Sequence, residues 1–326
     1  MSDHLRWGVL GAAKFAREHM APAIHAARRG RFAAIATSSA DKAAPFVDME
    51  PGLDVFTDYD AMLASDSIDA VYIPLPNHLH VEWAEKALRA GKHVLVEKPL
   101  AMRADAFDSV MALRDETGLL AAEAYMVVHH PRWQKVRELV QAGEIGELIL
   151  WDTVFSYDNR RDGGNIRNRA ETGGGAIPDI GVYTYGTARY VTGEEPDEIL
   201  STAFTWENGV DVWSHVTARF PSFHFSAVNS MRMMPRQEVT LQGDKGILRV
   251  KAPFNAGVFD QAELSLERPG MEIVTWRWPG VNQYVCQVEN FNNAVLDGAD
   301  YPCPLEFSKG TQAMIDRVFD AAGQPG

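Results

Sequence analysis

The chain has 326 residues, of which 46% are hydrophobic and 23% charged, a composition typical of a folded protein long enough for two domains. The formal net charge of −13, without a Lys/Arg block longer than the pair Arg28-Arg29, argues against binding to nucleic acid or an anionic membrane surface. No secretory signal or membrane span is expected, and Cys286 and Cys303 are too isolated for a disulfide framework or a metal site, so we expect a cytoplasmic protein without a bound metal.

The first element is the short apolar strand Leu5–Leu10, which runs into the segment Gly11–Ala16. This segment is a variant of the G-x-G-x-x-G/A turn that binds a dinucleotide pyrophosphate, with Ala13 at the second glycine position. The helix that follows offers free N–H groups and a favourable dipole to the anion. An ordinary strand–helix turn is the alternative. The residues expected to bind the cofactor here are Gly11, Ala13, Lys14 and Phe15.

The second strand, Phe32–Ala36, ends in three hydroxyl side chains, and the next helix begins at Ser39, which is a suitable N-cap. In a dinucleotide-binding fold, this strand end meets the adenosine ribose, and an acidic residue there binds the 2′-hydroxyl of NAD. No acidic residue stands there, so a 2′-phosphate is favoured: NADP is the expected cofactor and NAD the second candidate. A simple helix cap is the alternative. The expected contacts are Thr37, Ser38, Ser39 and Lys42.

Further strands alternate with helices up to Ala122. The expected elements are the strand Ala70–Ile73, a helix from Val81 to Ala90, the strand Val94–Val96, a helix from about Arg103 to Thr117, and the strand Leu119–Ala122. This alternation predicts a doubly wound parallel sheet, an α/β fold.

The carboxyl ends of these strands carry the most informative residues, because ligands bind at that edge of an open α/β sheet. Lys98, within Glu97-Lys98-Pro99, can donate a hydrogen bond to a reacting oxygen, although it could equally just end a strand. His78 and His80 could be ordinary helix-start residues. We expect the nicotinamide half of the cofactor to contact Leu75, Pro76, Asn77, His80, Glu97 and Lys98.

Beyond Glu123 the pattern changes to an amphipathic helix, Trp133–Gln141, and longer alternating strands with hairpin signals such as Glu207-Asn208-Gly209. We therefore divide the chain into a Rossmann dinucleotide-binding domain, residues 1–123, and an α/β domain, residues 124–326. The second domain should hold a large, mostly antiparallel sheet. Its last helix, Lys309–Ala322, could pack on either domain.

The predicted strand Val212–Phe220 has one apolar face and one face that carries Trp213. A tryptophan on the second face indicates that this face is also covered, either by another subunit or by helices of the same domain. We expect a homodimer or homotetramer formed through this sheet.

The segment from Tyr157 to Gly175 is predicted to be a long loop rich in arginine, asparagine and glycine. Long irregular loops in compact domains are usually functional or disordered. The donors Arg160, Asn165 and Arg167 suit sugar hydroxyls or cofactor phosphates, and a solvated polar loop is the alternative.

Several motifs in one order then make a family resemblance specific: Pro74–His80, Glu97–Ala101, Glu123–Met126, His130–Trp133, Gly173–Tyr183 and Tyr284–Asn290. With these motifs the chain resembles the glucose–fructose oxidoreductase/inositol dehydrogenase family (Gfo/Idh/MocA) over nearly its whole length. Tyr183, where many members carry histidine, and Asn165-Ile166-Arg167 are similar to the branch of D-xylose dehydrogenases and dimeric dihydrodiol dehydrogenases.

The resemblance implies a pyridine-nucleotide oxidoreductase that acts on a sugar, a polyol or a related ring alcohol. It makes Lys98 the catalytic lysine and maps the D-x-G-x-H/Y motif onto Asp179 and Tyr183. Tyr183 would then exchange the hydroxyl proton, with the Lys98 ammonium stabilising the phenolate, while Asp179 orients a substrate hydroxyl. The alternative is that Asp179 only caps a helix and Tyr183 belongs to the core. The expected substrate contacts are Tyr125, Arg160, Asn165, Arg167 and Asp179.

Three other functions fit the same motifs. They are a trans-dihydrodiol dehydrogenase, an oxidoreductase that keeps its nucleotide and moves hydride between two sugars, and a nucleotide-binding sensor without redox activity.

Overall fold

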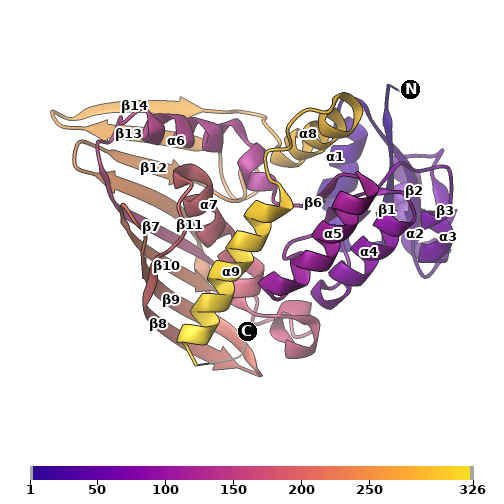
Figure 1. Ribbon diagram of the computed structural model, residues 1–326, viewed down its shortest axis with the longest axis horizontal. Coiled ribbons are helices and arrows are strands. Elements are labelled where there is room, and N and C mark those ends of the chain that lie inside the picture. The colour runs from indigo at the N-terminus through magenta and orange to yellow at the C-terminus, as the bar shows by residue number, and fades with distance from the viewer. Residues whose placement is uncertain (1–2, 324–326) are drawn as a thin grey trace. The chain divides into compact units, whose positions relative to one another are not determined.

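The computed structural model describes residues 3–323, which form two compact units (Figure 1). The first unit consists of the chain up to Ala101, Asp105–His129 and Asn282–Ser308. The second consists of Met102–Ala104, His130–Val281 and the chain from Lys309 onward. The segments of the two units alternate along the chain, whereas the sequence suggested one boundary between residues 123 and 124; that boundary stays a prediction.

The first unit is built on a parallel six-stranded sheet in the order β3-β2-β1-β4-β5-β6. The predicted doubly wound sheet is confirmed. Because β1 pairs with both β2 and β4, the strand order reverses at β1, and such a reversal is where open α/β sheets bind ligands. The strands are β1 (Leu5–Leu10), β2 (Gly30–Ala36), β3 (Asp54–Phe56), β4 (Ala70–Ile73), β5 (His93–Val96) and β6 (Ala121–Glu123).

Helices fill the connections of this sheet, and α4 and α5 lie side by side in Figure 1. The helix expected from about Arg103 starts later: a 3₁₀ turn, η3 (Ala104–Ala106), precedes α5, which ends at the left-handed Gly118. The remaining helical elements are η1 (Ala16–Met20), α1 (Ala21–Ala26), α2 (Ala40–Met49), α3 (Tyr59–Leu63), η2 (Asn77–Leu79), α4 (His80–Arg89), α5 (Phe107–Thr117) and η4 (Met126–His129).

Helix α8 (Gln283–Asp297) belongs to the first unit although it lies near the end of the sequence. The buried Asn292 accepts a hydrogen bond from Trp7 Nε1 at 2.9 Å and donates one to the Arg28 carbonyl at 3.0 Å. These bonds fix α8 against β1 and against the turn before β2, since breaking either would leave a buried polar group of Asn292 without its partner.

The second unit holds an eight-stranded sheet in the order β14-β13-β12-β11-β7-β10-β9-β8. Among its pairs only β7 with β10 is parallel within the described chain, so the mostly antiparallel sheet is confirmed. The strands are β7 (Leu148–Asp158), β8 (Glu198–Glu207), β9 (Val210–Arg219), β10 (His224–Ser230), β11 (Arg232–Gly243), β12 (Ile247–Lys251), β13 (Glu263–Arg268) and β14 (Glu272–Arg277).

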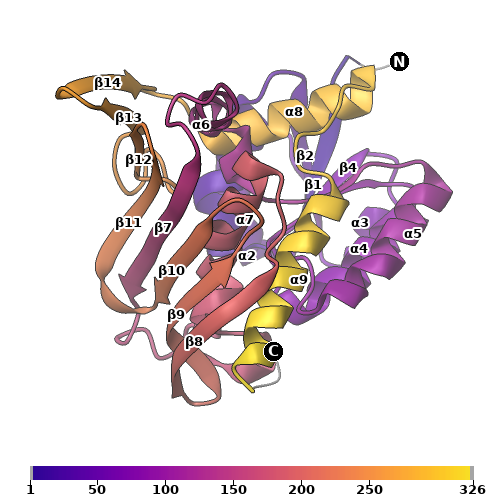
Figure 2. The ribbon, with the colours of Figure 1, turned by 60° about the vertical axis from the view of Figure 1, so that its left-hand side comes forward.

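One face of this sheet is covered by helices, as Figure 2 shows for α6 and α7. Trp133 of α6 (Pro131–Gln141) stacks on Trp151 of β7, and Tyr185 of α7 (Val182–Thr192) meets Phe225 of β10 edge-on. The last helix, α9 (Leu305–Ala321), places Phe319 on Phe204 of β8. The short elements η5 (Ile166–Asn168), η6 (Ala170–Thr172) and η7 (Ile177–Gly181) lie between β7 and α7.

The predicted hairpin is confirmed at the junction of β8 and β9. Asn208 and Gly209 both have positive φ, 51° and 79°, as the tight turn of a two-residue hairpin requires. No helix between residues 3 and 323 combines the length and apolar character needed to cross a lipid bilayer. The same residues contain no group of three or more His, Cys, Asp or Glu side chains placed to hold a metal ion.

Candidate active site

The turn after β1 has the geometry expected of a phosphate-binding turn. Gly11 has φ 109°, and a Cβ at this position would lie 3.1 Å from the Leu75 side chain, so only glycine fits. Phe15 packs against His19 and Tyr284, with ring centroids 4.9 and 5.6 Å away. The turn therefore leads from β1 into a helix start at which Phe15 is held by aromatic rings.

The end of β2 carries the hydroxyls predicted to face a ribose. Lys42 donates from Nζ to Ser38 Oγ over 3.0 Å, while Thr37 is buried. Ser39 precedes α2 as predicted, but its side chain makes no capping hydrogen bond, so that part of the prediction is wrong. Its backbone is extended there, with φ −157° and ψ 150°.

His80 joins the two loops that follow β4 and β5. It is fully buried, with Nδ1 2.8 Å from the Pro99 carbonyl oxygen and Nε2 2.7 Å from that of Leu75. Burial lowers the pKa of His80, and a neutral imidazole donates from one nitrogen at a time. Its role as a cofactor contact stays a prediction. In this structure its ring connects the loop after β4, which carries the predicted contacts Leu75, Pro76 and Asn77, to the loop after β5 at Pro99.

The backbone around Lys98 is held by two carboxylates. Glu97 accepts from the Tyr72 hydroxyl at 2.5 Å and from the Lys98 amide at 3.2 Å. Beyond the cis Lys98-Pro99 bond, the Leu100 amide donates to buried Glu123 at 2.8 Å. Burial raises the pKa of Glu123, and the charge of Lys98 acts in the opposite direction. The main chain on both sides of Lys98 is therefore fixed.

Asp179 and Tyr183 lie on the helical segment that starts at η7 and continues as α7. Asp179 Oδ2 accepts from the Tyr157 hydroxyl at 2.7 Å and pairs with Arg167 Nε at 2.8 Å. The charge of Asp179 raises the pKa of Arg167, and burial together with that charge raises the pKa of Tyr157. Asp179 therefore does more than cap a helix: it forms an ion pair with the arginine of the preceding loop.

The ring of Tyr183 packs against two phenylalanine rings. Its ring centroid is 5.9 Å from Phe155 and 5.9 Å from Phe254, which stack on each other at 4.9 Å. Phe254 follows Pro253, whose carbonyl accepts from Arg132 Nη2 at 2.6 Å and from Trp133 Nε1 at 2.9 Å. The buried Arg132 thus anchors the segment that supports the predicted catalytic phenol.

The glycine run before η7 lets the loop close onto the helix start. A Cβ at Gly174 would lie 2.5 Å from the Arg167 carbonyl oxygen and 2.6 Å from that of Arg169. The amides of Gly174 and Gly175 donate to these same carbonyls at 3.0 Å. A side chain at Gly174 would push Arg167 away from Asp179, which explains this glycine.

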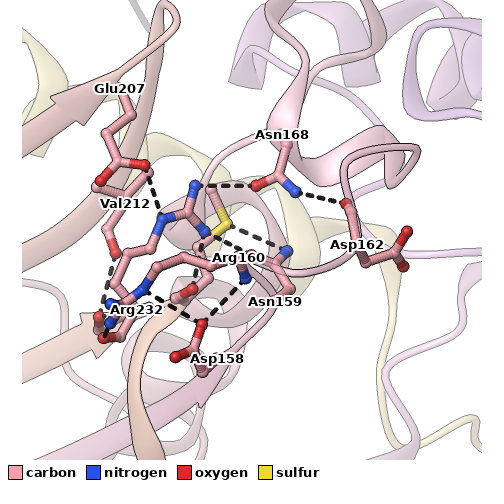
Figure 3. A network of polar contacts seen from close by, with 10 residues as sticks. Asp158, Asn159, Arg160, Asp162, Asn168, Glu207, Val212 and Arg232 are labelled. Carbon is pink, nitrogen blue, oxygen red and sulfur yellow. Dashed lines mark hydrogen bonds and ion pairs between the residues drawn. The ribbon is translucent and has the colours of Figure 1, made fainter.

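Figure 3 shows how the loop is tied to the sheet through Arg232 of β11. Arg232 donates from Nε to Glu207 at 2.8 Å, from Nη1 to Asn159 at 2.5 Å and from Nη2 to Asn168 at 3.1 Å. Arg160 bonds to the Arg232 carbonyl and pairs with Asp158 at 3.3 Å. The loop is therefore an ordered polar network.

Two residues that were predicted to contact substrate make hydrogen bonds with other groups of the protein. Asn165 accepts from the Arg167 amide at 3.0 Å and donates to Asp162 at 3.0 Å, while Arg160 belongs to the Arg232 network. Tyr125, a third, is 1% exposed and lies against Phe307. Their contact with substrate stays a prediction. Tyr157, which binds Asp179, was not predicted as a site residue; its place at the end of β7, just before an arginine-rich loop, was the signal in the sequence.

Comparison with known proteins shows the family. Residues 5–125 match the family described as "Oxidoreductase family, NAD-binding Rossmann fold", and residues 133–249 match the "GFO/IDH/MocA C-terminal domain". A dTDP-3,4-didehydro-2,6-dideoxy-alpha-D-glucose 3-reductase from Actinomadura kijaniata is 40% identical over 98% of this chain and 96% of its own. A D-xylose 1-dehydrogenase (NADP(+)) from Haloferax volcanii is 32% identical over 98% and 97%.

A similar structure is also known. The crystal structure of a 3-ketoreductase from Actinomadura kijaniata in complex with NADP and TDP-benzene has a TM-score of 0.89 at 30% identity, covering 98% of each chain. The predicted fold class and family are confirmed by these comparisons.

The Arg232 network leads to a test of loop order. Replacing Arg232 with alanine removes three hydrogen bonds between side chains, so we expect trypsin to cleave at Arg160, Arg161, Arg167 or Arg169 about 10-fold faster, because local opening governs cleavage. Mass spectrometry of the fragments measures the rates. Arg236→Ala is the matched control: it also removes a tryptic site from β11, but its partner Glu238 is exposed. Equal rates in both variants would contradict the role of the network.

Proposed function

We propose that this chain, which belongs to the GFO/IDH/MocA family of oxidoreductases, transfers hydride between NADP and a carbon of a sugar. The observation that carries the proposal is the placement of Tyr183 on the same short helical segment as Asp179, whose carboxylate is paired with Arg167. A proton-exchanging phenol beside a fixed polar pair suits the interconversion of a hydroxyl and a carbonyl group.

Two features of the first unit support NADP. Gly11 has a positive φ that other residues rarely adopt, and the turn leads into η1, whose start offers backbone N–H groups to a pyrophosphate. At the end of β2 stand Ser38 and Lys42, a hydroxyl and an ammonium, where NAD-specific folds place a carboxylate. The NADP-bound 3-ketoreductase and the NADP-dependent D-xylose dehydrogenase agree with this choice. NAD remains the second cofactor to test.

When bound, NADPH supplies the hydride. Tyr183 donates its hydroxyl proton to the oxygen of the reduced carbonyl, and takes a proton from the hydroxyl in the reverse direction. A free phenol has a pKa near ~10, so a neighbouring cation must stabilise the phenolate for the reaction to run near neutral pH. We assign this part to Lys98 of the Glu97-Lys98-Pro99 motif. Asp179, held by Arg167, would orient a second substrate hydroxyl.

For the substrate, the relatives favour a keto sugar carried by a nucleotide. The dTDP-sugar 3-reductase is 40% identical over 98% of the chain, and the similar 3-ketoreductase structure holds TDP-benzene. A free pentose such as D-xylose is the second candidate, supported by the 32% identical dehydrogenase and by Tyr183 in the D-x-G-x-H/Y motif. Dihydrodiol oxidation, sugar-to-sugar transfer with retained nucleotide and nucleotide sensing are outcomes that the first assay below separates.

We expect NADPH oxidation, followed by absorbance, when the protein is mixed with a dTDP-linked 3-keto sugar. With NADH, which lacks the 2′-phosphate that Ser38 and Lys42 would bind, kcat/KM should be about 10-fold lower. D-xylose and a trans-dihydrodiol with NADP⁺ form parallel arms. The protein is first checked for copurified nucleotide, which would indicate sugar-to-sugar transfer. Nucleotide binding without turnover in any arm would contradict enzymatic activity and favour a sensor.

Two substitutions test the catalytic assignment. Tyr183→Phe and Lys98→Met should each lower kcat at least ~100-fold, because they remove the proton donor and the cation that stabilises it. NADPH affinity, measured by fluorescence titration, should stay within a few-fold. Tyr190→Phe is the matched control: it removes a phenol hydroxyl from the same helix, at a residue whose ring faces Arg137. Near-normal turnover in Tyr183→Phe or Lys98→Met would reject the assignment.

We also propose that the chain forms a homodimer or homotetramer through the open face of the eight-stranded sheet. The pairing register aligns His215, Val228, Val154 and Glu238 across four strands of that face, and half-buried Trp213 lies on the same side of β9. Aromatic and aliphatic side chains among polar ones are typical of subunit interfaces.

Trp213→Asp should convert this oligomer into monomers, because it removes an aromatic contact and buries an unpaired carboxylate in the interface. Light scattering coupled to size-exclusion chromatography measures the mass. Met271→Asp is the control, since Met271 is 94% exposed in a turn of the same unit. A monomeric wild-type protein would refute the proposed assembly.

A further inference from the structure

Asp211 is a buried carboxylate on β9 that the proposed reaction does not use. It is 1% exposed and is followed by a β-bulge: Asp211 pairs with Trp206 of β8, but the next pair joins Trp213 to Thr205. The extra residue, Val212, shifts the alternation of side chains along β9. Bulges redirect side chains in this way and occur often beside active sites. Because of the bulge, Asp211 lies on the helix-covered face of the sheet, whereas Trp213 lies on the open face.

The carboxylate of Asp211 lies at the start of the segment that carries Asp179 and Tyr183. It accepts a hydrogen bond from the Ile177 amide at 2.8 Å, and the amide of Ala176 is a further donor. Ala176 holds the N-cap position of η7 but has no side-chain acceptor of its own. The free N–H groups of a helix start normally need such an acceptor. The side chain of Asp211, which lies 34 residues after Ile177 in the chain, is that acceptor.

Gly175 makes this contact possible. A Cβ at Gly175 would lie 2.2 Å from Asp211 Oδ1, and its φ of 132° is one that other residues rarely adopt. The glycine run therefore serves two contacts at once: Gly174 lets the Arg167 loop approach, and Gly175 leaves room for Asp211.

The charges around Asp211 link it to the predicted catalytic residues. Burial raises its pKa from 3.8 to about 7; the backbone N–H groups oppose this shift, and the charge of Asp179 adds to it. The titratable groups that interact with Asp211 are Asp179 of η7 and Tyr185 of α7. Arg167 pairs with Asp179 and thereby reduces the repulsion between the two carboxylates.

We propose that Asp211 is a positioning residue: its carboxylate fixes the first turn of η7 and so sets the placement of Asp179 and Tyr183. This inference rests on the proposed catalytic role of Tyr183. The ionised carboxylate accepts from both amides, whereas a protonated one loses acceptor capacity and gains an O–H that needs its own partner. Turnover should therefore rise as Asp211 ionises.

Stability changes in the opposite direction. Because the pKa of Asp211 is raised by folding, its contribution to stability is full below its ordinary value of 3.8 and is lost as the pH rises through about 7. If the role of Asp211 were purely structural, activity would fall together with stability as the pH rises. If Asp211 positions the catalytic residues, activity rises with pH while its contribution to stability falls, so an experiment can separate the two roles.

The test compares three variants of the full chain. Asp211→Asn removes the ionisation, Gly175→Ala displaces the carboxylate, and Ser214→Ala is the matched control, a fully buried hydroxyl on the same strand. For each we measure kcat between pH 6 and 8 with the best substrate of the assay above, NADPH affinity, the melting temperature over the same pH range, and hydrogen exchange of peptides covering residues 176–183.

In the wild type and in Ser214→Ala, kcat should rise with a midpoint near pH 7. In Asp211→Asn that rise should disappear, and kcat at pH 8 should fall roughly 10-fold or more with NADPH affinity unchanged, since a small displacement of a catalytic group has effects of this size. Gly175→Ala should lower kcat similarly. An unchanged pH profile in Asp211→Asn would overturn the proposal.

Hydrogen exchange separates this proposal from the proposed function. Residues 176–183 should exchange faster in Asp211→Asn and Gly175→Ala than in Ser214→Ala, after correction for intrinsic rates, whether or not any sugar is turned over. Faster exchange without turnover in the wild type would reject the proposed function and retain the positioning contact. Unchanged exchange in both variants would reject the contact itself.

Discussion

The ion pair between Arg167 and Asp179 is the contact on which the loop between β7 and η7 depends. Only 12% of the Asp179 side chain is exposed, so its charge needs a partner, and Arg167 reaches it from a loop more than ten residues earlier in the chain. The loop can approach only because Gly174 lacks a side chain. The loop must also stay ordered, and the hydrogen bonds of Arg232 to Asn159 and Asn168 tie it to the sheet.

The phenol of Tyr183 depends on a second set of contacts beneath it. Phe155 belongs to β7. Phe254 follows Pro253, whose carbonyl accepts a hydrogen bond from the buried Arg132 guanidinium. Burial lowers the pKa of Arg132 to about 9, because removing the charged guanidinium from water costs free energy. Its two main-chain acceptors, on Lys251 and Pro253, partly offset this cost and hold the segment that supports Tyr183.

Much of this arrangement could be predicted from local sequence. The strand ends at Ile73 and Val96, the turn at Gly11 and the hairpin at Asn208-Gly209 follow from runs of apolar residues and from glycine, and the structure has them. The D-x-G-x-H/Y motif drew attention to Asp179 and Tyr183. The partners Tyr157 and Asp211 were missed because their roles depend on pairing between distant segments. In particular, the bulge at Val212 reverses the alternation that a strand pattern predicts.

Polar residues of the loop between β7 and η7 were predicted to contact substrate because of their side-chain chemistry. Arg160 and Asn165 have the chemistry that binds sugar hydroxyls, and that chemistry is equally suited to closing a loop on itself. Arg160 bonds to the Arg232 carbonyl, and Asn165 caps the short helix that presents Arg167. A residue type therefore predicts which hydrogen bonds can form, whereas the fold decides which partner is near enough to form them. For this chain, Asn165 caps the short helix that presents Arg167, and Arg167 pairs with the carboxylate of Asp179 on the segment of the predicted catalytic tyrosine.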